Sequence, residues 1–216
     1  MSFKAKFSKL ILKLWRWTPV GERPEFSCVI TAGPHTANID YVLMMLMAWS
    51  RGMELSWMGK HTLFEKPILG KFFTATGGIP VDRTAPQGLV GQMVERFEQT
   101  PRLYLAIPPE GTRSLTEYWK SGFYRIAQGA GVPIVMCSID TKTRVVEIGP
   151  TVHPSGDLVA DMDLFREYYG PKVGFKPELY GPIRLREEEA LGDGDALGDG
   201  NADGANPGDA TDASAS

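Results

Sequence analysis

The stretch FSCVITAGPHTANID, residues 26–40, decides the fold, because it carries the chain from a predicted strand into a predicted helix through a short turn. Residues 26–33 form an apolar run that predicts a strand, and a helix is expected to start near Asn38. His35 and Asp40 lie five positions apart in this stretch. On one continuous helix, that spacing would leave the two side chains about 140° apart. They can meet only if the backbone turns between them, with His35 in a loop and Asp40 entering the helix.

Outward from this stretch, residues 26–186 alternate strand and helix signals. The predicted strands are FSCVITAG (26–33), ELSWMGK (54–60), GGIPVDR (77–83), LYLAIPPEG (103–111), PIVMCSID (133–140) and RVVEIG (144–149). The intervening helices are expected to start near Asn38, Lys66, Pro86, Gly122 and Asp157. The pattern predicts an α/β fold with a mixed, largely buried β-sheet flanked by helices.

The charges divide the chain into unlike parts. All 23 Lys and Arg residues lie within residues 1–186, which carry a net charge of +6, whereas residues 187–216 contain nine acids and no base. The basic part suits an anionic partner such as a phosphate or an anionic lipid. We therefore expect an N-terminal helix in residues 1–20, one domain in residues 21–186, and a disordered acidic tail in residues 187–216.

Residues 2–17, SFKAKFSKLILKLWRW, predict a basic amphipathic helix that ends at Thr18-Pro19. The residues with helical spacing on its apolar side are Phe3, Phe7, Leu10, Ile11, Leu14 and Trp17. Four basic residues cluster opposite them, namely Lys6, Lys9, Lys13 and Arg16. This composition favours a helix lying flat in a membrane interface. The alternative is a helix that packs on the core and leaves its lysines in water.

Several other classes of protein are disfavoured. No apolar run reaches 18 residues, so no transmembrane helix is expected. The N-terminus lacks the features of a signal peptide, and Cys28 and Cys137 lie in strand-like runs that suit reduced core thiols. DGNADG (199–204) imitates the opening of a calcium-binding loop but has Ala210 where glutamate is required, so no metal site is expected. A reducing cytoplasm fits best.

Four further stretches join PHTANID in order. They are WMGKHTLF (57–64), the glycine-rich block ending in arginine at Gly77–Arg83, PPEGTRS (108–114) and GVPIV (131–135). Together they resemble the glycerolipid and lysophospholipid acyltransferase family, which includes the 1-acylglycerol-3-phosphate acyltransferases. The resemblance covers roughly residues 28–150 and is most specific at the P-E-G-T-R-S block.

The resemblance implies that His35 is a general base and that Asp40 orients it. The chemistry agrees, because a histidine can take the proton of an alcohol near neutral pH, and a carboxylate on its other ring nitrogen stabilises the imidazolium that forms. A thioester donor is already activated, so the alcohol can attack it directly without an acyl-enzyme intermediate. The sequence has no G-x-S-x-G nucleophile elbow.

The same resemblance places substrate-binding residues after the later strands. Arg83 and Arg113 can each offer a planar fork to phosphate oxygens, and Lys60 offers a point charge. Gly111 would allow backbone N–H groups to approach a ligand. Gly78, in the Gly77–Arg83 block, and Thr112, in the PPEGTRS block, are also expected to contribute to substrate binding. Glu110 either anchors its loop or binds an acceptor hydroxyl. The chain departs from the family at Pro34, often asparagine, and at Ala37, often serine.

These residues predict an O-acyltransferase that takes an acyl group from acyl-CoA or acyl carrier protein, with no other cofactor. The expected acceptor is a glycerophosphate or lysophospholipid hydroxyl, foremost 1-acylglycerol-3-phosphate, in phospholipid biosynthesis at the inner face of the cell membrane. Another lipid, glycolipid or aminolipid hydroxyl is the alternative acceptor. A catalytically silent lipid-binding protein is a second alternative. Nucleic-acid binding is not expected, because no recognisable motif accompanies the basic charge.

Overall fold

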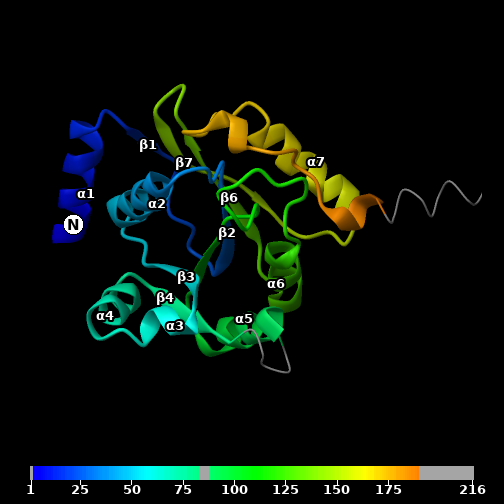
Figure 1. The fold of residues 1–216 in the computed structure, drawn as a ribbon, viewed down its shortest axis with the longest axis horizontal. Coiled ribbons are helices and arrows are strands. Elements are labelled where there is room, and N and C mark those ends of the chain that lie inside the picture. The colour runs from blue at the N-terminus through cyan, green and yellow to red at the C-terminus, as the bar shows by residue number, and fades with distance from the viewer. Residues whose placement is uncertain (1, 83–87, 190–216) are drawn as a thin grey trace, which may run out of the picture.

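The structure, a computed structural model, describes residues 2–82 and 88–189. A seven-stranded sheet forms its centre and helices flank the sheet (Figure 1). The strands are β1 (Thr18–Val20), β2 (Cys28–Gly33), β3 (Leu55–Lys60), β4 (Gly78–Val81), β5 (Tyr104–Ile107), β6 (Ile134–Asp140) and β7 (Val145–Val152). The helices are α1 (Phe3–Leu14), α2 (Asn38–Ser50), α3 (His61–Phe64), α4 (Pro67–Ala75), α5 (Gly88–Gln99), α6 (Gly122–Ala130), α7 (Leu158–Tyr169) and the 3₁₀ turn η1 (Pro177–Leu179).

The strand order β1-β7-β6-β2-β5-β3-β4 places β2 near the centre. Strand β2 runs parallel to both β5 and β6, and β3 runs parallel to β5 and β4. Only the β6–β7 pair is antiparallel among the described strands. The mixed sheet is therefore confirmed. Because β2, β5, β3 and β4 are parallel, the loops that follow them emerge at one edge of the sheet, where ligands bind in open α/β sheets.

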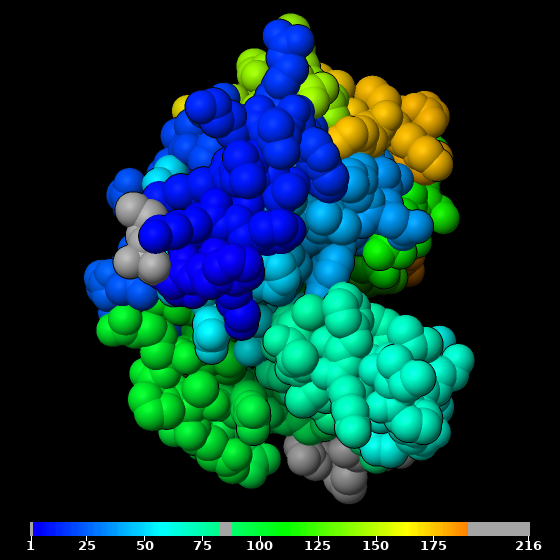
Figure 2. Space-filling model, turned by 90° about the vertical axis from the view of Figure 1, so that its left-hand side faces the viewer, coloured from blue at the N-terminus to red at the C-terminus, as the bar shows by residue number. Residues whose placement is uncertain are grey.

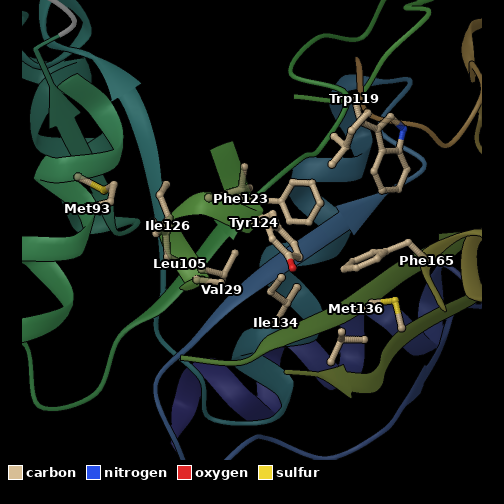
Figure 3. Packing of buried hydrophobic residues seen from close by; sticks show 14 of the residues in the cluster. Val29, Met93, Leu105, Trp119, Phe123, Tyr124, Ile126, Ile134, Met136 and Phe165 are labelled. Atoms are coloured by element: carbon tan, nitrogen blue, oxygen red, sulfur yellow. The ribbon is translucent and has the colours of Figure 1, made fainter. Parts of the chain in front are cut away.

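Alternating side chains of the strands fill two cores. Val29, Leu105 and Ile134 face α5, α6 and α7, and Figure 3 shows them beside Ile126 and the aromatic rings that α6 and α7 contribute. On the opposite face, Cys28, Ile30, Tyr104 and Val135 pack against α2. This period of two follows from the pleat of a strand, and burial on both faces explains why the strands are apolar along their whole length.

Helix α1 packs on α2 with a narrow strip of small or apolar residues. Ala5, Ser8 and Leu12 are buried, and the Ser8 hydroxyl donates to the Lys4 carbonyl oxygen at 2.8 Å. Figure 2 shows α1, in dark blue, lying on the surface beside the light-blue α2. The opposite side of α1 is exposed. The structure shows the packing on the core that the alternative predicted, and the membrane interface stays a prediction for the exposed side of the helix.

The structure confirms all six predicted strands but shortens several. The strand predicted over residues 103–111 ends at Ile107, because Pro108 and Pro109 lead into a loop. Helices start where expected after residues 37, 66, 121 and 157, whereas the start predicted near Pro86 lies outside the described residues. The predicted disordered tail begins too early: residues 187–189 are helical, and Glu187 and Glu188 bind Arg125 and Arg166, while residues 190–216 lie outside the described residues. Within residues 2–82 and 88–189, no helix is long and apolar enough to cross a membrane.

The end of the first helix was predicted wrongly. Helix α1 stops at Leu14, Arg16 adopts a left-handed φ of 60°, and Thr18–Val20 forms strand β1 against β7. Trp17 consequently turns into the core, where it is only 6% exposed, instead of continuing the outer apolar side of the helix. The pairing partner of β1 lies more than 120 residues away, so the local pattern could not reveal this strand.

Candidate active site

His35 and Asp40 meet in the turn between β2 and α2. His35 follows the carboxyl end of β2, and Asp40 lies in the first turn of α2. The His35 Nδ1 atom is 3.6 Å from Asp40 Oδ2, and the two side chains are 15% and 3% exposed. This distance is longer than a hydrogen bond, and catalytic hydrogen bonds are often long in structures without substrate. The backbone turn that the spacing required is present.

Asp40 is held by the backbone of the same turn. Its Oδ2 atom accepts the N–H groups of Thr36 at 2.8 Å and Ala37 at 2.7 Å. Ala37 is the N-cap of α2, and its methyl side chain cannot accept a hydrogen bond from a backbone N–H of the first helical turn. The Asp40 Oδ1 atom is buried without a hydrogen-bond partner in the described structure. The carboxylate is thus fixed by two backbone donors, and the imidazole lies beside it.

Burial keeps the His35 ring neutral. Burial, together with the nearby positive charge of Arg113, lowers the pKa of His35 to about 4. Burial also raises the pKa of Asp40, although the backbone hydrogen bonds from Ala37 and Thr36 oppose that effect. A neutral imidazole at pH 7 can accept a proton, so its protonation state suits a general base.

Glu110 lies beneath the same turn. Its Oε1 atom accepts the backbone N–H of His35 at 2.9 Å, and the residue is only 3% exposed. Burial raises the pKa of Glu110 to about 7. Strands β2 and β5 are neighbours, which brings together two residues 75 positions apart in sequence. This geometry corresponds to the first of the two sequence-based alternatives, in which Glu110 anchors a loop.

A pocket of about 420 Å³ opens at His35 and Asp40. Its volume lies within the range of small-molecule sites. The polar end also contains Asn38 and Arg113. The remaining wall is largely apolar and aromatic, and comes from α2, β3, α3, α4 and the sheet: Tyr41, Met44, Trp57, Met58, Leu63, Phe73, Ala106 and Ile139. The pocket thus combines one imidazole and one guanidinium with a largely apolar wall.

Sequence reasoning did not find the aromatic wall. Trp57 packs edge-to-face on Tyr41, with ring centroids 5.7 Å apart, and on Phe73 at 5.5 Å. The Trp57 Nε1–H donates to the Thr76 carbonyl oxygen at 3.0 Å, which fixes the indole. The available signal was Trp57 within the WMGKHTLF block, but its neighbours come from α2 and α4, which only the fold brings together.

Arg113 is the predicted phosphate ligand that the structure places in this pocket. It follows β5, the neighbour of β2, and lines the pocket together with His35. Its guanidinium forms no hydrogen bond or ion pair with any part of the chain that the structure describes. An arginine whose five donors remain available beside a cavity can bind an anion.

The other predicted binding residues lie around the pocket rather than in it. Lys60 ends β3 and lines a separate surface pocket with Val81 and Asp82. Gly78 starts β4 under Phe64 and Phe73, where an added Cβ would lie 2.8 Å from the Phe64 ring. Gly111 has a left-handed φ of 70°, and the Thr112 hydroxyl accepts the Ser114 N–H at 3.2 Å. Arg83 lies outside the described residues.

The remaining histidines and cysteines are apart from this site. His61 is exposed and pairs with Glu65 at 3.1 Å. Both cysteines are free thiols, as expected, and burial raises the pKa of Cys28 to about 12.

Comparison with known proteins finds similarity to acyltransferases. The acyltransferase family model matches residues 22–140. Over 97 residues the chain is 30% identical to the 1-acyl-sn-glycerol-3-phosphate acyltransferase of Escherichia coli (strain K12). The aligned region covers 42% of this chain and 39% of that protein. The chain thus matches well under half of that relative's length.

The fold resembles the crystal structure of the 1-acyl-sn-glycerophosphate (LPA) acyltransferase PlsC from Thermotoga maritima. The TM-score is 0.54 with 16% sequence identity, over 76% of this chain and 74% of that chain. At this identity the likeness concerns the fold alone. The family model spans more than half of the sequence and contains the His35–Asp40 turn, the pocket-lining strands and the Glu110–Arg113 loop. The chain therefore belongs to the acyltransferase family.

Proposed function

We propose that the protein is an O-acyltransferase that moves an acyl group from acyl-CoA or acyl carrier protein to a hydroxyl of a glycerophosphate or lysophospholipid. The acceptor proposed first is 1-acylglycerol-3-phosphate, the acceptor named for both relatives. One observation carries the proposal: the His35 imidazole, 15% exposed and lowered in pKa, lies 3.6 Å from a fixed carboxylate, and both line a pocket with a largely apolar wall.

In the proposed mechanism, Asp40 holds the Nδ1 side of His35, so Nε2 accepts the proton of the acceptor hydroxyl. The alcohol oxygen attacks the thioester carbonyl carbon, and the carbonyl electrons move onto its oxygen. When the tetrahedral intermediate collapses, the ester bond forms, the carbon–sulfur bond breaks, and the imidazolium returns its proton to the thiolate. Asp40 stabilises the imidazolium between these steps.

Arg113 and the apolar wall supply the proposed binding interactions. The Arg113 guanidinium, which has no partner in the described part of the chain, suits a phosphate. The glycerol backbone of the acceptor would set the distance between that phosphate and the reacting hydroxyl. Lys60 ends β3, the strand next to β5, so we propose that it extends the positive charge along this edge of the sheet. Arg83 is proposed as a further phosphate ligand from the sequence alone. The aromatic and aliphatic wall formed by residues such as Trp57 and Phe73 suits an acyl chain.

We also propose that the protein binds the surface of an anionic membrane through α1, at the inner face of the cell membrane. The exposed side of α1 carries Phe3, Phe7, Leu10 and Leu14, and residues 2–17 contain five basic residues and no acid. An interfacial helix of this kind combines apolar burial with attraction to anionic lipid. Contact with the bilayer would bring the active site to a lipid acceptor.

The test is acyl transfer from palmitoyl-CoA, followed as thiol release with and without 1-acylglycerol-3-phosphate. Acceptor-dependent release is expected. His35→Ala should lower turnover about 100-fold or more, a usual magnitude for loss of a general base. His61→Ala is the matched control and should retain full turnover, because His61 is exposed and paired with Glu65.

The alternatives give different results in the same assay. Release with a glycolipid or aminolipid acceptor, but not with a phosphate-bearing one, would reassign the acceptor within the same enzyme class. Vesicle binding without thiol release under any condition would identify a silent lipid-binding protein. Near-normal turnover in His35→Ala would contradict the assignment of the base.

A further inference from the structure

Helix α4 presents an apolar ridge to solvent. Ile68 is 84% exposed, Phe72 is 55% exposed and Leu69 is 47% exposed. They lie at positions i, i+1 and i+4, so they share one side of the helix. We call these three residues the α4 ridge. Such a contiguous set of large apolar side chains indicates an interaction surface.

The ridge is held outward by the packing beneath it. On the inner side of α4, Gly70 approaches α3 so closely that an added Cβ would lie 2.2 Å from the Phe64 carbonyl oxygen. Phe73 packs on Trp57 and Phe64, at centroid distances of 5.5 and 6.2 Å. Helix α4 is therefore fixed by Gly70 and Phe73, and the ridge residues have no place in the core.

Helix α1 presents a comparable surface. Its outer face, defined here as Phe3, Phe7, Leu10 and Leu14, is exposed, with Phe3 at 83%. Phe3 and Phe7 stack on each other at 6.4 Å. Helical geometry places this face opposite the strip of Ala5, Ser8 and Leu12 that contacts α2.

Both helices lie on the same side of the molecule. In Figure 1 they occupy the left-hand side, and Figure 2, which views that side, shows α1 in dark blue above the turquoise surface of α3 and α4. The catalytic pocket lies between α2, the helix on which α1 packs, and helices α3 and α4, since its wall includes Tyr41 and Met44 from α2, Leu63 from α3 and Phe73 from α4. Two exposed apolar surfaces thus flank the cavity that contains His35.

Positive charge accompanies both surfaces. The α1 segment contains five basic residues and no acid. Residues 60–76 contain Lys60, Lys66 and Lys71 against the single acid Glu65, and all three lysines are exposed. Apolar side chains with lysines beside them match an anionic lipid surface, where the chains enter the acyl region and the ammonium groups stay at the head groups.

We propose that the α4 ridge is a second membrane-contact element, which acts with the outer face of α1 to seat the pocket against an anionic bilayer. This inference deepens the proposed function and rests on it. One amphipathic helix leaves a protein free to rotate about its axis, whereas two contacts on either side of the pocket fix its orientation. With both seated, the pocket faces the lipid from which substrate must come.

The test compares three full-length double variants. Ile68→Ser with Phe72→Ser removes the ridge, and Phe7→Ser with Leu14→Ser removes the α1 outer face. Val159→Ser with Leu164→Ser is the matched control, because these residues of α7 are also exposed and apolar. Binding is measured by flotation with vesicles of phosphatidylglycerol and phosphatidylcholine, and acyl transfer is measured on a short-chain lysophosphatidate below its micelle concentration.

The ridge variant should bind vesicles about tenfold or more weakly, because two large apolar side chains no longer enter the bilayer. Its transfer to the soluble acceptor should stay unchanged, and the α7 variant should behave as the wild type. If the ridge variant binds normally while the α1 variant is released, α1 alone is the anchor and the inference is wrong, although the proposed function stands.

Two other outcomes are decisive. A ridge variant that binds vesicles normally but has a smaller mass by light scattering would show that the ridge binds a second copy of the chain, and the inference would fail. A wild-type protein that transfers no acyl group, but loses vesicle binding when the ridge is removed, would support the surface and refute the enzymatic function.

Discussion

Replacing Asp40 with asparagine separates its electrostatic effect from its structural one. The asparagine carbonyl oxygen can still accept the two N–H groups of Thr36 and Ala37 that Oδ2 accepts now. The lost property is the negative charge 3.6 Å from His35 Nδ1. That charge has no imidazolium partner while His35 is neutral, so its effect appears when the proton is transferred.

The magnitude follows from the distance. Two unit charges 3.6 Å apart attract by about 4 to 5 kcal/mol at an effective dielectric constant of about 20. If the proton is about half transferred in the transition state, the barrier rises by about 2 kcal/mol, which is roughly a 30-fold lower kcat. The Michaelis constants for both substrates should change little.

The assay is initial-rate thiol release, together with a thermal melt. Asp157→Asn is the matched control, because Asp157 caps α7 through the Ala160 N–H at 3.1 Å and lies outside the pocket. Both variants lose a charge at a helix N-terminus, which costs about 0.3–1 kcal/mol of stability. Only Asp40→Asn should lose turnover. A kcat in Asp40→Asn equal to that of Asp157→Asn would refute the proposed role.

Three further predictions concern the predicted site residues and the N-cap of α2. In a Glu110→Gln variant, which removes the carboxyl group with a pKa of about 7, kcat/KM should stay level as pH falls from 7 and drop only near pH 4, because the pKa of His35 is lowered to about 4; a limb near pH 6.5 in this variant would contradict the neutral base. Arg113→Ala and Arg83→Ala should each raise the KM for a phosphate-bearing acceptor far more than the KM for the thioester; unchanged acceptor KM values would favour an acceptor without phosphate. Arg113→Ala should also move the acid limb to higher pH, because one cause of the lowered His35 pKa is removed. Ala37→Ser should stabilise the protein by about 1 kcal/mol, seen as a higher Tm, because a hydroxyl at the N-cap can accept the Asp40 backbone N–H; an unchanged or lower Tm would show that the turn cannot place that hydroxyl.

The sequence predicted the His35–Asp40 turn because every signal for it is local. The apolar strand, the spacing of the pair and the start of the helix all fall within 15 residues. The choice between two roles for Glu110 remained open for the opposite reason. It depends on β2 and β5 being neighbours, which is a property of the sheet order and not of the PPEGTRS stretch itself.

Helix α1 shows another limit of the sequence pattern. Periodicity identified its exposed apolar residues but not the strip that contacts α2, because Ala5 and Ser8 are small and Ser8 is polar. A buried serine that donates to its own helix backbone has no distinctive pattern. Deleting residues 1–17, the obvious test of a membrane helix, would also uncover α2 by removing Leu12, so substitutions on the outer face are the cleaner experiment.

The two sides of α1 also make this helix an engineering handle. Ala5, Ser8 and Leu12 set how closely it approaches α2, the helix whose first turn holds Asp40. The outward residues Phe3, Phe7, Leu10 and Leu14 are exposed, and Phe3 and Phe7 stack on each other. If α1 seats the protein on a bilayer as proposed, its outward residues could be rewritten to direct the protein to membranes of different lipid composition, or to a synthetic support, while the inward strip keeps the His35–Asp40 turn in place.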